Sequence, residues 1–219
     1  MDMRFFWWLA GWSCIALGAL SACEGSTHED NSLSHGPLKV VCLGDGLTAG
    51  TGVPADSAYP AQLERLLNAK GYQAKVVNAG IKGEVVADAA ARVAWLLQQR
   101  FDIFVLATGW DDLRQRPEAG EDRAQAMGAL VKTITTAAPE SPLWLMLPPA
   151  HATFTAPQAT FAKDVTALAA EYPGCQVLPP LPRAANAGTY WQDDLPYPNT
   201  AGQRQLAEQI FEMINTTYE

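Results

Sequence analysis

Three loops of the sequence carry residue types that could do proton-transfer or acyl-transfer chemistry. They are the glycine-rich turn Gly44–Gly50 (GDGLTAG), Gly109–Asp112 (GWDD) and Asp194–Tyr197 (DLPY). Paired carboxylates can support glycoside hydrolysis or bind a hard cation. His151, in the loop that begins at Pro148, is a further candidate base. Carboxylates in such loops more often hydrogen-bond the loops themselves, and that is the role we expect.

The elements between these loops alternate between strand-like apolar runs and helical periodicities. Such alternation predicts a parallel sheet with helices on both faces and right-handed crossovers. We expect a three-layer α/β/α flavodoxin-like sandwich with a five-stranded parallel sheet in the order 2-1-3-4-5. Its ligand chemistry should lie at the carboxyl ends of the strands. The strand candidates are Lys39–Leu43, Lys75–Ala79, Asp102–Thr108, Leu143–Leu147 and Gln176–Leu178.

The helices are predicted from stripes of apolar residues at helical spacing. The first stripe runs from Tyr59 to Leu67, with Asp56 or Ser57 as its N-cap, and the last begins at Asn199 or Thr200.

The turn at Gly44–Gly50 resembles the first block of the SGNH (GDSL) hydrolases, which normally reads G-D-S-L-T-x-G. The resemblance is to the thioesterase–lysophospholipase branch and covers Leu38 to the C-terminus. It implies a serine nucleophile, a histidine base, and an aspartate three residues before that histidine. It also implies an oxyanion site made by the backbone N–H groups of the serine and of a second-block glycine, together with an asparagine side chain.

Set against that pattern, three of the four name-giving residues are changed in this chain. Gly46 stands at the serine position and has no side chain to attack with. In Asn78–Gly83 (NAGIKG) the second-block glycine is kept as Gly83. The third block of the family reads G-x-N-D; aligned here on Gly109 and Asp111, Trp110 falls at the asparagine position.

The last block of the family reads D-x-x-H-P-N, and here it is Asp194–Asn199 (DLPYPN). Asp194 matches the orienting aspartate, while Tyr197 replaces the base. A phenol is a poor proton acceptor at neutral pH because its ordinary pKa is near 10.

These changes predict a fold whose serine triad has been dismantled and whose remaining cleft binds a ligand or partner. The candidates are an acyl chain, a glycan or an envelope protein, and we expect neither cofactor nor metal. One alternative is an esterase or lysophospholipase with a rearranged site that uses water, Thr48 or His151. Another is a structural envelope component with a closed cleft. The candidate binding residues are Asp45, Gly46, Gly83, Trp110, Asp111, Asp194 and Tyr197.

The N-terminus predicts export and a lipid anchor. An apolar run from Phe5 to Leu20 follows Arg4, which is typical of a signal peptide covering residues 1–22. The sequence Leu20–Cys23 (LSAC) resembles a bacterial lipobox, so we expect Cys23 to be lipidated. Residues 23–37 should then form a polar tether and residues 38–219 the folded domain, held at the outer membrane or in the periplasm.

The net charge and two cysteines of the predicted domain support two further expectations. The net charge of −8 argues against nucleic acid as a partner. Cys42 falls in the first predicted strand and Cys175 lies just before the last. The predicted order separates these two strands, so we expect two isolated thiols rather than a disulfide.

Overall fold

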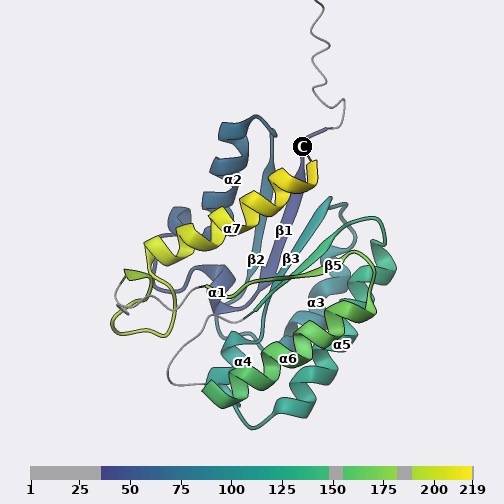
Figure 1. Ribbon diagram of the computed structural model, residues 1–219, viewed down its shortest axis with the longest axis vertical. Helices are drawn as coiled ribbons and strands as arrows, with labels where there is room; N and C mark the ends of the chain where they lie inside the picture. The colour runs from purple at the N-terminus through teal and green to yellow at the C-terminus, as the bar shows by residue number, and fades with distance from the viewer. Residues whose placement is uncertain (1–35, 148–154, 182–188, 219) are drawn as a thin grey trace, which may run out of the picture. The chain divides into compact units, whose positions relative to one another are not determined.

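The sheet has the predicted order. The structure is a computed structural model that describes residues 36–147, 155–181 and 189–218 of the 219-residue chain. Within these ranges five parallel strands form one sheet, ordered β2-β1-β3-β4-β5, between layers of helices (Figure 1). The α/β sandwich with flavodoxin-like strand order is confirmed. The strands are β1 (Lys39–Gly44), β2 (Lys75–Gly80), β3 (Ile103–Ala107), β4 (Leu143–Met146) and β5 (Cys175–Leu178).

Strand β1, which lies between β2 and β3, sets the level at which the functional loops begin. Its residues Val40–Leu43 are buried, as expected for an apolar run covered by helices on both faces. Its last residue, Gly44, is in register with Gly80 of β2 and Ala107 of β3. The turns that follow these three strands therefore start side by side at one edge of the sheet.

Two groups of helices cover the sheet (Figure 1). α2 (Tyr59–Lys70) packs against α7 (Thr200–Tyr218) on one face, while α3 (Val86–Leu96), α5 (Gly120–Ala137) and α6 (Thr155–Glu171) cover the other. Right-handed crossovers require this division, because the chain moves outward from β1 to β2 and then reverses direction toward β3. None of the helices in the described ranges is both long and apolar enough to span a bilayer.

Short helices at the strand ends are the main difference from the predicted elements. α1 (Gly46–Ala49) and α4 (Trp110–Gln115) were not predicted, because so few residues cannot display a helical period.

The predicted N-cap of α2 is also wrong. Asp56 and Ser57 lie in the 3-10 turn η1 (Ala55–Ser57), and the capping position falls to Ala58. The Asn199 Oδ1 atom accepts from Gly202 N at 3.0 Å, so Asn199 caps α7 as expected.

Cys42 lies in β1 and Cys175 in β5, and both are free thiols. β3 and β4 stand between these strands, as the predicted order requires.

An arginine on α3 ties the ends of β1 and β2 together. Arg92 Nη2 donates to Ala79 O at 2.6 Å and to Gly44 O at 3.5 Å. Its guanidinium group also forms a bidentate pair with Glu84, with 2.6 Å between Nη2 and Oε2. The Glu84 side chain is only 4% exposed, so its charge depends on this partner.

Replacing this arginine should destabilise the fold. Arg92→Met keeps an apolar stem but leaves the Glu84 carboxylate buried and unpaired. We expect the free energy of unfolding to fall by about 1.5–3 kcal/mol, the range for hydrogen bonds to charged groups. Urea unfolding followed by tryptophan fluorescence measures the change.

The matched control is Arg204→Met, which breaks an exposed pair with Glu208 on α7. An exposed pair of this kind is worth about 0.3–0.5 kcal/mol. Equal losses in the two variants would contradict a specific role for Arg92.

Candidate functional site

Asp45, the first residue after β1, is fully buried and caps two short helices. Its Oδ1 atom accepts from Leu47 N at 3.0 Å in α1. Its Oδ2 atom accepts from the backbone N–H groups of Trp110 at 2.7 Å and of Asp111 at 3.0 Å, at the start of α4. Burial raises the pKa of Asp45 to about 7, and the nearby charge of Asp111 adds to the rise. This carboxyl group therefore fixes the first loop to the third.

The Asp111 carboxylate lies against the two backbone amides that the resemblance assigns to the oxyanion. Its Oδ2 atom accepts from Gly46 N and from Gly83 N, each at 2.9 Å. Gly83 has a φ of 83°, a conformation that favours glycine. An oxyanion would need the same two donors, so the chain's own carboxylate occupies the oxyanion position. A carboxylate there repels developing negative charge instead of stabilising it.

The other carboxylate oxygen of Asp111 is also fully engaged. The Tyr197 hydroxyl donates to Oδ1, and Arg114 Nε donates to the same atom at 3.1 Å. The Arg114 guanidinium also lies 5.6 Å from the centre of the Tyr197 ring. Burial raises the pKa of Tyr197 well above its ordinary value, with the contact to Asp111 adding to the rise, so its phenol stays protonated and acts as a donor. Four donors thus converge on one buried carboxylate.

The Gly46 and Gly83 amides bond to Asp111 and not to Trp110, the residue that the sequence analysis set at the asparagine position. Its indole Nε1 donates to Pro196 O at 2.8 Å, and its ring packs 6.2 Å from the ring of Trp191. Counting G-x-N-D from Gly109 without a gap places Trp110 at the variable position and Asp111 at the asparagine. The contacts of Asp111 support this second alignment.

Gly46 lies where a side chain would meet this network. A Cβ atom built on it would stand 2.7 Å from Asp111 Oδ2, 2.7 Å from the Tyr197 hydroxyl and 3.0 Å from Thr51 Oγ1. These separations are too short for a real Cβ, and both nearer groups are buried and hydrogen-bonded. A serine therefore does not fit while Asp111 and Tyr197 stay in place.

Asp112 positions the second loop. Its Oδ2 atom accepts from Val86 N, the first residue of α3, at 2.8 Å, and its Oδ1 atom accepts from Arg116 at 3.4 Å. Gln115 Nε2 adds a bond to Gly83 O at 3.0 Å. Consecutive turns of α4 therefore hold the loop that presents the Gly83 amide.

The five carboxylates of the three candidate loops and their borders (Asp45, Asp111, Asp112, Asp193 and Asp194) do not all meet. Asp45, Asp111 and Asp112 are buried and bonded to backbone N–H groups, as expected for carboxylates that hold loops. Asp193 and Asp194 are exposed, and within the described residues the side chain of Asp194 forms no hydrogen bond. The predicted orienting aspartate is thus not brought to the Tyr197 hydroxyl, which bonds to Asp111 instead.

Thr48 and His151 were the alternative candidates for a catalytic side chain. Thr48 Oγ1 hydrogen-bonds the Tyr59 hydroxyl at 3.1 Å and donates to Ala107 O at 3.4 Å, so it is engaged in the interior. His151 lies outside the described residues. Among the residues that are described, no group of three His, Cys, Asp or Glu side chains is placed to hold a metal ion.

Sequence reasoning missed two parts of this site. It gave Asp111 a loop-holding role and did not place its side chain at the oxyanion position, although the unbroken G-x-N-D spacing was the signal. It also passed over Arg114, which has no counterpart in the four blocks. Only the helical turn from Asp111 to Arg114, three residues apart in α4, would have indicated the contact.

The sequence is similar to a known protein family and to one known esterase. The model of the GDSL-like lipase/acylhydrolase family matches residues 42–205. An arylesterase from Vibrio mimicus is 30% identical over 83 residues, which make up 37% of this chain and 42% of that protein. The chain thus matches less than half of that relative's length.

Solved structures share the fold at low sequence identity. TesA has a TM-score of 0.72 and 22% identity, over 81% of this chain and 98% of that one. A family 3 carbohydrate esterase from Clostridium thermocellum has a TM-score of 0.70 and 20% identity, over 82% and 96%. The esterase EstA from Pseudoalteromonas sp., in a structure inhibited by monoethylphosphonate, has a TM-score of 0.68 and 22% identity, over 81% and 97%.

Removing the Asp111 carboxylate should destabilise the fold and open an anion site. Asp111→Ala leaves two amides, a phenol and a guanidinium without their acceptor, and breaking such a buried pair costs about 3–5 kcal/mol. Asp111→Asn should cost less, because its oxygen still accepts from both amides. In thermal unfolding at constant ionic strength, acetate should raise the Tm of the alanine variant more than that of the asparagine variant. An equal rise in both would contradict this.

The raised pKa of Asp45 predicts an unusual pH dependence of stability. In the unfolded chain this carboxyl group loses its proton near its ordinary pKa of 3.8, whereas in the fold it keeps the proton until about pH 7. The folded state therefore binds more protons in this window, so the contribution of Asp45 to stability is full below pH 4 and is lost as the pH rises to 7. Urea unfolding at a series of pH values measures it. Asp111→Asn removes a charge that raises this pKa and should flatten the dependence.

Proposed function

Since the chain belongs to the GDSL-like lipase/acylhydrolase family, we propose that it keeps the SGNH-type esterase fold without serine esterase activity and acts as a binding module. The observation that carries this proposal is the position of Asp111. Its carboxylate takes the two amides that would hold an oxyanion, beside a glycine that has no nucleophile to offer. Both the attacking group and the site for the developing charge are therefore missing.

The cellular setting of this module is part of the proposal. The signal-peptide pattern of residues 1–22 and the lipobox at Leu20–Cys23 support a lipid anchor on Cys23 in the bacterial cell envelope. Two or more acyl chains on one cysteine would hold the protein firmly, since one chain binds only marginally. The polar residues 23–37 then separate the domain from the membrane surface.

A ligand would meet the rim of the former catalytic site. Two exposed aliphatic side chains stand in the loops that carry this site: Ile81, two residues before Gly83, and Leu195, two residues before Tyr197, with 48% and 40% of their surface exposed. The partly exposed Arg114 guanidinium bonds to Asp111 and lies over the ring of Tyr197. Exposed apolar side chains in the flanking loops, together with this cation, favour an acyl chain with an anionic head over a glycan as the ligand.

A second candidate is a structural component of the envelope with a closed site. The observation that favours it is burial, because Trp110, Asp111 and Tyr197 are at most 2% exposed. The two candidates differ in their response to ligand. Lysophospholipid below its micellar concentration should raise the Tm of a binding module, whereas a structural component should show no shift.

Restoring the hydrolase residues tests the proposal. The variant Gly46→Ser, Asp111→Asn, Tyr197→His supplies the nucleophile, removes the repelling carboxylate and replaces the phenol by a base. We expect it to hydrolyse p-nitrophenyl acyl esters while the unmodified chain does not. The asparagine oxyanion donor alone is worth about 10²–10³ in rate.

The matched control introduces the asparagine at position 110 instead of position 111. The variant Gly46→Ser, Trp110→Asn, Tyr197→His leaves Asp111 at the oxyanion position and should stay inactive. Hydrolysis by this control at the rate of the first variant would show that Asp111 does not block the site. Hydrolysis by the unmodified chain, with an acyl adduct trapped on any side chain, would overturn the proposed loss of activity.

A further inference from the structure

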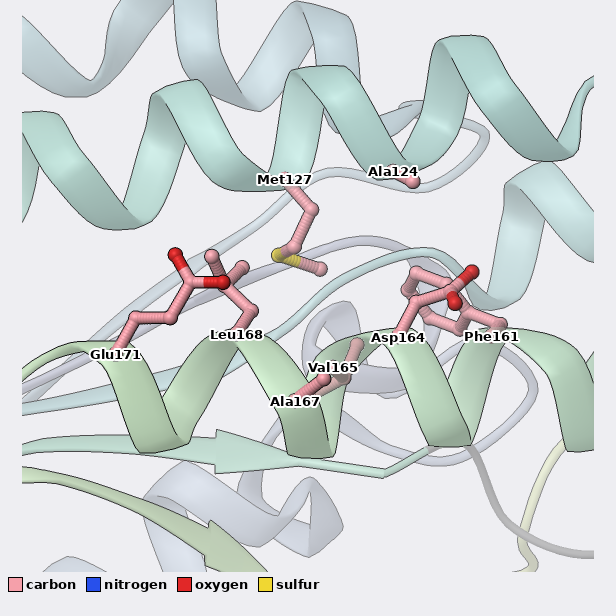
Figure 2. Close-up of a pocket in the computed structure, with 8 residues that line it drawn as sticks. All are labelled: Ala124, Met127, Phe161, Asp164, Val165, Ala167, Leu168 and Glu171. Atoms are coloured by element: carbon pink, nitrogen blue, oxygen red, sulfur yellow. The ribbon is translucent and has the colours of Figure 1, made fainter.

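A pocket lies between α5 and α6, on elements that do not carry Gly46, Asp111 or Tyr197. It is a pocket of about 230 Å³, shown in Figure 2. Its floor is apolar, with Met127 from α5 facing Phe161, Val165 and Leu168 from α6. Small alanine side chains of both helices leave room at its edges.

Two carboxylates of α6 bracket this floor. Asp164 and Glu171 are seven residues apart, so they lie on the same face of the helix, separated by about 10 Å along its axis. In Figure 2 they stand at opposite ends of the pocket, with the side chains of Met127 and Leu168 between them. Within the described residues neither carboxylate has a hydrogen bond or an ion pair, so both are available to a ligand.

From this arrangement we infer that the pocket binds a linear aliphatic diamine or polyamine. Each terminal ammonium group meets one carboxylate, and the methylene chain between them covers the apolar floor, as the stem of a lysine side chain does on protein surfaces. The net charge of −8 favours the approach of a dication. This inference does not depend on the proposed function, because it involves other residues and another ligand.

The two ends of the pocket are not equivalent. The Arg123 guanidinium lies 5.2 Å from the centre of the Phe161 ring and interacts electrostatically with Asp164. A bound ammonium group at that end shares its carboxylate with a resident cation. Glu171, which is exposed and has no such neighbour, should therefore contribute more to binding than Asp164.

Isothermal titration calorimetry of the full chain with diaminooctane tests the inference. The matched probes are octylamine, which lacks the second ammonium group, and diaminopropane, which is too short to reach both carboxylates. We expect diaminooctane to bind more tightly than either probe. Glu171→Gln should weaken its binding about three- to fivefold, as expected for a partly exposed ion pair, and Asp164→Asn should weaken it less.

Glu212→Gln on α7 is the control for the loss of one negative charge away from the pocket. It should leave the affinity unchanged. Equal binding of octylamine and diaminooctane would overturn the inference, because the second carboxylate would then contribute nothing. An equal loss in Glu212→Gln, or no heat of binding for any of the three amines, would also overturn it.

Discussion

The bond between one carboxylate and two backbone amides governs this site. Asp111 Oδ2 accepts from Gly46 N and Gly83 N, which come from the ends of β1 and β2. Compared with the asparagine that the family resemblance implies for the oxyanion site, an aspartate offers an acceptor instead of a donor and adds a negative charge. In a hydrolase such amides stabilise the negative charge that develops in the transition state. Here the Asp111 carboxylate accepts from both amides in the resting protein.

The other buried carboxylates make this contact possible. Asp45 holds the start of α4 against the turn after β1, and Asp112 holds the start of α3 against α4. Because Asp111 lies between these two anchors in the first turn of α4, its carboxylate has little freedom to leave. The loops at this edge of the sheet are thus kept in place by hydrogen bonds among their own residues, which do not depend on any reaction.

The sequence predicted the fold well because strand order follows from local patterns and general rules. Runs such as Val40–Leu43 show buried strands directly, and right-handed crossovers leave few arrangements of them. The site was harder to predict. Gly46 and Tyr197 were predicted to be replacements from the family pattern. The position of the Asp111 side chain depends instead on the direction of one short turn of α4, which no sequence periodicity indicates. Asp194 matched the family pattern, yet its side chain lies at the surface.

The replacements at these positions depend on one another. A carboxylate at position 111 needs donors, and the Tyr197 hydroxyl reaches it where an imidazole would be shorter and would carry a changeable proton. Once the phenol and the carboxylate meet, the space beside residue 46 is filled, and only a glycine avoids contacts of 2.7 Å with both. Each of these residues therefore fits the space and the hydrogen bonds that the other two leave, so we expect substitutions at Gly46, Asp111 and Tyr197 to act together rather than additively.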